Sequence, residues 1–131
     1  MAATAAGCIA VTIGGAAGCL CRYLIQQMPL LGADRTWPTL AVNIAGCLLI
    51  GIIATLIDHR GSLQLLRLML VTGFLGGLTT YSTFTLDAAS IARTGELIKA
   101  IGYVAVTLLS GFAAYAGGLL IARAIISQLK L

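Results

Sequence analysis

Long apolar stretches, separated by short polar segments, set the pattern of this chain. Four stretches carry no Arg, Lys, Asp, Glu or His, and they cover residues 1–21, 36–57, 68–86 and 100–122. A helix of about 20 residues crosses the hydrocarbon core of a bilayer, so each stretch is long enough to span it once. The pattern predicts an all-α membrane protein with four transmembrane helices, at about residues 5–26, 39–58, 65–92 and 98–126.

Composition and the short connections indicate a single membrane domain. The 131 residues are 60% hydrophobic and 9% charged, whereas an average soluble domain is about 25% charged. The connecting segments 27–38, 59–66 and 93–99 are too short to fold on their own, so residues 1–131 are expected to form one four-helix domain. Four helices enclose little interior, and a pore with room for a substrate therefore requires a second copy of the chain.

The positions of the charges matter more than the net charge of +4. Basic residues stand singly at the ends of the stretches, without the clusters typical of nucleic-acid binding, so we expect a lipid bilayer and no nucleic acid as partner. Four spans put both termini on one side, which would hold Arg60, Arg67, Arg123 and Lys130. The opposite side would hold Arg22, Arg35, Arg93 and Lys99. Because the Lys and Arg bias sets orientation, this even division predicts dual topology and an antiparallel homodimer.

No arrangement of catalytic residues is found in the sequence. There is no Ser/His/Asp order, no H-E-x-x-H and no phosphate-binding loop, and the four cysteines form no metal or redox motif. We therefore expect a protein that is not an enzyme.

The third stretch differs in kind from the others. Residues 73–85 read G-F-L-G-G-L-T-T-Y-S-T-F-T, with three glycines and six hydroxyl side chains in the middle of one span. Glycine costs a helix interior about 1 kcal/mol and threonine also disfavours it, so we expect a helix break near the bilayer midplane. Such a break is tolerated inside protein or along a wet cavity, and it frees carbonyl oxygens. The alternative is a close-packed glycine helix, which accounts for Gly73 and Gly77 but not for the hydroxyl residues.

Two further stretches carry a polar face. In the second, Asn43 follows Thr39 by one turn, and in the fourth Tyr103, Thr107 and Ser110 are spaced by four and three residues. Each face has a structural alternative, because a lone membrane Asn is commonly an interhelical hydrogen-bonding group and Ser or Thr often bonds back to its own helix. Together with the broken span, the two faces favour a polar track.

Two charged residues near the spans are open to two interpretations each. Arg22, at the end of the first stretch, is equally an interfacial anchor or an electropositive mouth that concentrates anions. Asp87, after the broken span, is either a functional acid or a helix-end carboxylate at the interface.

The groups expected at membrane depth are neutral donors. They comprise the Asn43 amide, the hydroxyl groups, and the positive ring edges of Tyr81 and Phe84. Neutral donors along a narrow path suit a small, strongly hydrated anion, because they replace water without trapping the ion.

The sequence contains the motifs G-x-x-x-R-Y at 18–23, T-L-x-V-N-x-x-G at 39–46 and G-F-x-G-G-L-T-T-[FY]-S-T-F at 73–84. In this order, and over nearly the whole chain, they resemble the Fluc/CrcB fluoride channels of bacteria. The resemblance implies a dual-topology antiparallel homodimer with two fluoride pores and a structural Na⁺ at the dimer interface. Its implied function is a fluoride-selective channel that exports F⁻ across the bacterial inner membrane and relieves fluoride toxicity.

The resemblance also assigns roles to residues. Asn43 is then the pore amide, Tyr81 and Phe84 are the paired pore rings, and the backbone carbonyls of Gly76 and Thr79 hold Na⁺. Tyr81 departs from the family, which usually has phenylalanine there.

The remaining assignments complete the pathway. Tyr103 and Thr107 match the hydroxyl pair on the fourth helix, and Ser82 and Thr83 fall within the pore motif. The predicted mouth or access residues are Arg22, Thr39 and Asp87.

Two other functions compete with the fluoride channel. A small dual-topology multidrug exporter has a similar length and charge balance, but it depends on a carboxylate within the first helix, and none occurs here. A non-transporting membrane assembly subunit would use the glycines and Asn43 for helix packing alone. That function predicts no ion flux and tolerance of Asn43→Asp.

Overall fold

The computed structural model describes residues 4–28, 36–61 and 63–129, and within these ranges the chain forms helices and connecting turns. Arg35 and Lys130, two members of the charge count, lie outside the described residues. The helices are α1 (Ala5–Gln26), α2 (Thr36–Arg60), α3 (Gln64–Arg67), η2 (Leu68–Leu75), α4 (Gly76–Leu78), α5 (Tyr81–Arg93) and α6 (Leu97–Leu129).

Four helical segments are long and apolar enough to cross a membrane. They are Ala5–Gln26, Thr36–Arg60, Gln64–Arg93 and Leu97–Leu129. The third segment contains α3, η2, α4 and α5 in succession. The prediction of an all-helical chain with four candidate spans is therefore confirmed.

Local sequence signals account for several helix ends. The Thr4 side chain accepts a hydrogen bond from the Gly7 amide at 3.1 Å and caps the start of α1. Gly61, just after α2, and Gly95, between α5 and α6, have positive φ angles of 67° and 86°. Residues with a Cβ rarely adopt this conformation, so glycine allows both short connections.

The third span changes its winding twice. In η2 the helix is wide, and it ends where the Gly76 amide donates to the carbonyl oxygen of Val71, five residues earlier. After the single turn of α4, Thr79 (φ −80°, ψ 155°) and Thr80 (φ −149°, ψ 111°) are extended, and α5 begins at Tyr81. The depth of these two residues relative to the bilayer midplane stays a prediction.

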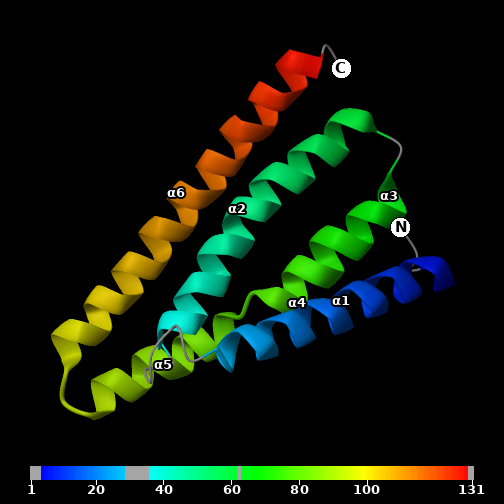
Figure 1. Cartoon of the computed structure of the whole chain (residues 1–131). Helices are drawn as coiled ribbons and strands as arrows, with labels where there is room; N and C mark the ends of the chain where they lie inside the picture. The colour runs from blue at the N-terminus through cyan, green and yellow to red at the C-terminus, as the bar shows by residue number, and fades with distance from the viewer. Residues whose placement is uncertain (1–3, 29–35, 62, 130–131) are drawn as a thin grey trace.

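The helices pack as two pairs (Figure 1). α2 packs along α6, whereas α1 packs along η2 and α4. Glycine makes both contacts possible, because a Cβ at Gly51 would lie 2.5 Å from the Tyr115 carbonyl oxygen and one at Gly77 would lie 2.6 Å from the Gly15 carbonyl oxygen. The two pairs meet near α5 and diverge from there (Figure 1).

Close packing is confirmed for two of the three glycines in the third span. A Cβ at Gly73 would lie 2.8 Å from the Val11 carbonyl oxygen, and Gly77 contacts α1 as described above. Gly76 differs, because its nearest neighbour would be the Val71 carbonyl oxygen at 3.9 Å. Packing within this chain therefore explains Gly73 and Gly77 but not Gly76.

The buried core is small and the apolar surface is large. Val42, Leu75 and Leu78 form the central cluster where α2 meets the third span. Large apolar side chains are exposed elsewhere, and Ile98 and Phe112 on α6 are 87% and 74% exposed. Such a surface suits contact with lipid or with another membrane helix.

Candidate functional site

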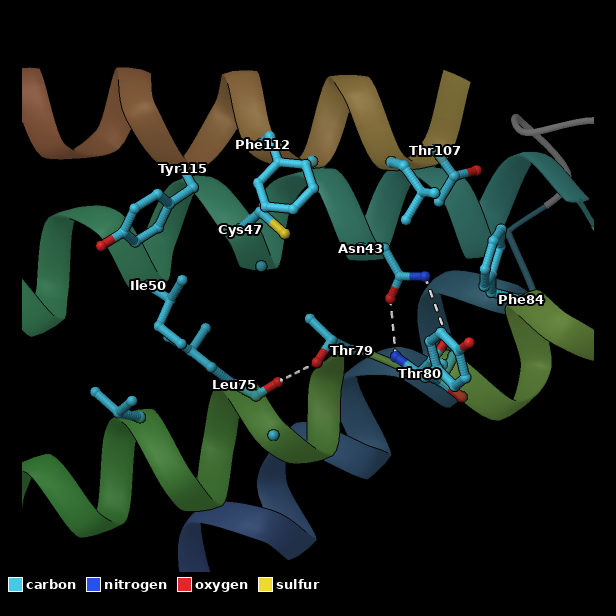
Figure 2. Close-up of a pocket in the computed structure, with 16 residues that line it drawn as sticks. Asn43, Cys47, Ile50, Leu75, Thr79, Thr80, Phe84, Thr107, Phe112 and Tyr115 are labelled. Carbon is cyan, nitrogen blue, oxygen red and sulfur yellow. Dashed lines mark hydrogen bonds between the residues drawn. The ribbon is translucent and has the colours of Figure 1, made fainter. Parts of the chain in front are cut away.

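A groove of about 620 Å³ lies between the two helix pairs and combines polar, aromatic and small residues (Figure 2). Its polar lining comes from Asn43 on α2, Thr79 and Thr80 between α4 and α5, and Thr107 on α6. Its aromatic lining consists of Tyr81, Phe84, Phe112 and Tyr115. The groove is open along one face, because Tyr81 and Phe112 are 78% and 74% exposed.

Asn43 binds the backbone at the point where the third span is extended. Its Oδ1 accepts a hydrogen bond from the Thr80 amide at 2.8 Å, and its Nδ2 donates to the Thr80 carbonyl oxygen at 3.2 Å. Figure 2 shows both bonds on one side of the groove. The structural alternative for Asn43, an interhelical hydrogen-bonding group, is therefore observed. An amide nitrogen carries two N–H groups, so the second N–H remains for another acceptor.

Hydroxyl groups gather around Thr80 at the start of α5. Thr80 Oγ1 accepts from the Thr83 amide at 3.2 Å, donates to Thr83 Oγ1 at 3.0 Å, and lies 3.3 Å from Ser82 Oγ. The first bond caps the helix, and the second leaves the Thr83 hydroxyl proton for another partner. The positive end of the α5 dipole thus lies beside the groove.

Three aromatic rings form a row along α5 and α6. The ring centroids of Tyr81 and Phe84 are 5.7 Å apart, and those of Phe84 and Tyr103 are 5.6 Å apart, with tilted planes. Tilted rings present positive edges as well as faces. The Tyr103 hydroxyl also donates to Asp87 Oδ2 at 3.5 Å, which links α6 to α5.

The polar face of α6 is partly satisfied within its own helix. The Thr107 hydroxyl donates to the Tyr103 carbonyl oxygen at 2.7 Å, and the Ser110 hydroxyl donates to the Val106 carbonyl oxygen at 2.6 Å. The alternative that these hydroxyls bond back to their helix is confirmed. Thr107 still lines the groove, although only 8% of the residue's surface is exposed.

A second cavity of about 900 Å³ lies at the α5 end of the molecule. Thr39, Thr83 and Asp87 line it together with Gln26 and Glu96. Thr80 lines the first cavity and Thr83 lines the second, so the hydrogen bond between them lies between the two cavities.

The predicted mouth residues separate into two places. Thr39 and Asp87 meet in the second cavity. Arg22 does not line either cavity, and its Nε donates to the Gly77 carbonyl oxygen at 3.0 Å.

The two residues predicted to hold Na⁺ lie at the groove. Gly76 and Thr79 both line it, and the Thr79 hydroxyl is already donated to the Leu75 carbonyl oxygen at 2.9 Å. Among the described residues no group of three or more His, Cys, Asp or Glu side chains is placed to hold a metal. Backbone carbonyls where a span is interrupted suit a hard cation such as Na⁺, and the space beside Gly76 leaves room for one, so these residues fit the ion.

Sequence reasoning missed Thr80 and the far wall of the groove. Thr80 is both the cap of α5 and the partner of Asn43, and the pairing of Thr80 with Thr83 three residues later was the available signal. Leu108, Phe112 and Tyr115 line the groove from α6, and their spacing of four and three residues places them on one helix face.

Comparisons with known proteins agree on one family. The family described as "CrcB-like protein, Camphor Resistance (CrcB)" matches residues 9–119. The chain is 44% identical over 118 residues to the fluoride-specific ion channel FluC of Rhizobium etli strain CIAT 652, covering 88% of this chain and 94% of that protein. It is 43% identical over 116 residues to the fluoride-specific ion channel FluC of Agrobacterium fabrum, covering 86% and 93% respectively. The protein of the same name from Pseudomonas fluorescens is 40% identical over 118 residues, covering 85% and 92%.

Proposed function

Because this chain belongs to the CrcB family, we propose that it is a fluoride-specific ion channel, which lets F⁻ leave the cell across a bacterial inner membrane and so relieves fluoride toxicity. Its four membrane-spanning helices make it a multi-pass membrane protein. The observation that carries the proposal is identity of 44% over 94% of a relative that bears this name.

The two cavities supply a route for a small anion. F⁻ enters through the second cavity, which Thr39 and Thr83 line, and passes the hydroxyl cluster around Thr80. It then meets the free N–H of Asn43 and the ring edges of Tyr81 and Phe84. Neutral donors replace part of the ion's hydration shell without a charge that would hold it.

A second copy of the chain, in the opposite orientation, is proposed to cover the groove. Two observations support this antiparallel homodimer: the groove is open beside Tyr81 and Phe112, and the basic residues divide evenly between the two ends. An open groove with exposed apolar walls conducts no ion through a bilayer, because lipid chains fill it. Each pore is therefore completed by the partner copy.

Na⁺ is proposed as a structural ion where the two copies meet. The carbonyl oxygens of Gly76 and Thr79, which both line the groove, would hold it in each copy. The open space at Gly76 supports this site, because packing within one chain gives no reason for glycine there.

The test is efflux from liposomes that contain the purified protein, measured with a fluoride electrode beside a chloride electrode. We expect rapid loss of fluoride without loss of chloride, and no loss of either ion from liposomes without protein. Folded protein that releases neither ion would overturn the channel and favour the assembly subunit. Release of both ions would contradict the fluoride selectivity.

A further inference from the structure

The Arg22 side chain crosses from α1 to the third span and ends on its backbone. Its Nε donates to the Gly77 carbonyl oxygen at 3.0 Å, and its Nη2 contacts Cys19 Sγ at 3.8 Å one turn earlier on α1. The first contact joins residues 55 positions apart and is partly buried. A side chain held at two points in this way is fixed against the protein and does not extend into the cavities.

Gly77 lies where the backbone needs outside support. α4 has three residues and ends at Leu78, so its last carbonyl oxygens have no amide of the same helix to accept from. An unpaired carbonyl at membrane depth is costly, and the carbonyl end of a helix carries partial negative charge. The Arg22 guanidinium supplies both a hydrogen-bond donor and a positive charge at this point.

Contacts from α1 and from α2 hold the chain on both sides of the extended residues Thr79 and Thr80. On the α1 side, a Cβ at Gly77 would lie 2.6 Å from the Gly15 carbonyl oxygen, and Arg22 binds the same residue. On the α2 side, Asn43 binds both backbone groups of Thr80. The chain between these two anchors contains Leu78 and Thr79 and leads directly into α5.

We propose that Arg22 is a positioning residue for ion conduction, which holds the end of α4 and offsets its partial negative charge beside the anion route. Through this contact it sets the start of α5 and therefore the places of Thr80 and Phe84. The inference rests on the proposed function, and it differs from a mouth cation that attracts anions from solution.

Ionic strength separates the two roles. Fluoride efflux is measured for Arg22→Gln and for Arg93→Gln, a matched loss of one exposed arginine at the end of α5, in about 0.01 M and about 1 M impermeant salt. The Debye length falls from about 30 Å to about 3 Å over this range. Loss of a charge-assisted hydrogen bond slows efflux of Arg22→Gln about ten-fold at both salt concentrations, and Arg93→Gln stays near wild type. A deficit that disappears at high salt, or that Arg93→Gln shares, would overturn the proposal.

The NMR signal of the Gly77 carbonyl provides a second measurement. The sequence contains two Gly–Leu peptide bonds, at 77–78 and 118–119, so ¹³C-carbonyl glycine with ¹⁵N-leucine gives two selective NMR signals from protein in lipid. We expect the Gly77 signal to move in Arg22→Gln while the Gly118 signal on α6 stays in place. An unmoved Gly77 signal would overturn the contact, whether or not the wild type conducts fluoride.

Arg22→Lys tests whether the contact or the charge alone matters, and it replaces Arg22→Gln if that variant does not fold. Lysine keeps the charge but lacks the planar fork of donors. If the contact matters, the fluoride efflux of Arg22→Lys should approach that of the wild type only to the extent that the Gly77 NMR signal returns to its wild-type position. Full efflux with a displaced Gly77 signal would show that charge suffices and would contradict the positioning role. Wild-type protein without fluoride flux would refute the proposed function instead.

Discussion

The Asn43 side chain forms hydrogen bonds with the backbone of Thr80. The amide of Thr80 donates to its Oδ1 and the carbonyl of Thr80 accepts from its Nδ2, so one side chain satisfies both backbone groups of an extended residue. Among side chains of this length, only a carboxamide presents a hydrogen-bond acceptor and a donor side by side. Serine, threonine or aspartate at this position would leave one of the two backbone groups unpaired.

Asn43→Asp is expected to reduce fluoride efflux about ten-fold or more, because a carbonyl that loses its hydrogen-bond donor in a partly buried place costs about 1–3 kcal/mol. The carboxylate accepts from the Thr80 amide but repels the Thr80 carbonyl oxygen, and its negative charge lies beside the anion route. Efflux is measured per amount of folded protein from gel filtration. Gln128→Glu, the same amide-to-acid change in the exposed last turn of α6, serves as control. Normal efflux in Asn43→Asp would favour the packing role.

Tyr81→Phe is expected to keep fluoride selectivity over chloride. The Tyr81 ring lies 5.7 Å from that of Phe84, and a phenylalanine preserves this ring contact. Its hydroxyl group has no hydrogen bond within the described part of the chain, so its removal changes the fluoride rate by less than about ten-fold. The measurement is the ratio of fluoride to chloride efflux from liposomes. Chloride efflux in this variant would refute the assignment of Tyr81 to the pore.

The candidate residues were readable from the sequence to the extent that their chemistry was unusual for a span. Asn43 stands out among apolar neighbours, and Thr79, Tyr81 and Phe84 belong to the motif at 73–84 that resembles the family; the structure places all four along one groove. Thr80 was one hydroxyl in a run of several, and its importance depends on which backbone group faces Asn43. The contact of Arg22 could not be predicted, because its partner is a backbone carbonyl 55 residues away, which no residue type reveals.

At the scale of elements, paired glycines decide which helices touch. Gly14 and Gly18 on α1 face the third span, where a Cβ on either would collide with a carbonyl oxygen, of Met69 and Phe74 respectively. Backbones that approach so closely gain packing contacts that larger residues prevent. This contact brings Arg22 within reach of Gly77.

Gly14→Ala is expected to destabilise the fold by about 1–3 kcal/mol, because its added Cβ forces α1 away from η2. Gly117→Ala is the matched control, since nothing lies within 4 Å of a Cβ there and alanine favours the helix by up to about 1 kcal/mol. Unfolding in increasing denaturant in detergent micelles gives both values. The packing assignment fails if the two variants unfold at the same concentration.

The sequence predicts the helices well where length and hydropathy determine them. It predicts the winding of the backbone within a helix less well. Charge-free stretches locate the spans because a charge at membrane depth is costly. The wide turn of η2 depends on the bond between the Gly76 amide and the Val71 carbonyl oxygen, and the local sequence there is as apolar as any ordinary helix. η2 packs along α1, and an apolar sequence alone does not distinguish a wide turn from an ordinary helical turn.

At the scale of the whole molecule, one chain leaves the groove open. Its two helix pairs diverge and leave an open groove, and the central cluster consists of three buried residues, Val42, Leu75 and Leu78. Hydropathy predicted four spans but contains no information about which faces meet lipid and which meet a partner, since both are apolar. The even charge count therefore carries the prediction of orientation.

Variants that shift the balance of Lys and Arg between the two ends of the molecule test the antiparallel homodimer. Ser127→Lys with Gln128→Lys adds two charges at the end that carries the termini, and Arg60→Gln with Arg123→Gln removes two from the same end. Because excess Lys and Arg keep a short segment on the cytoplasmic side, each double variant should insert in one orientation, and the two orientations should be opposite. A reporter fused to the C-terminus measures each orientation.

Each double variant alone should fail to protect cells against fluoride, and the two expressed together should restore protection. In the proposed homodimer the groove is completed by a copy that faces the other way, so a population with one orientation would have no partner. Wild-type chains should place the same reporter on both sides of the membrane. Protection by one biased variant alone, with its reporter confined to one side, would mean that a single orientation conducts and that the antiparallel pair is not the working unit.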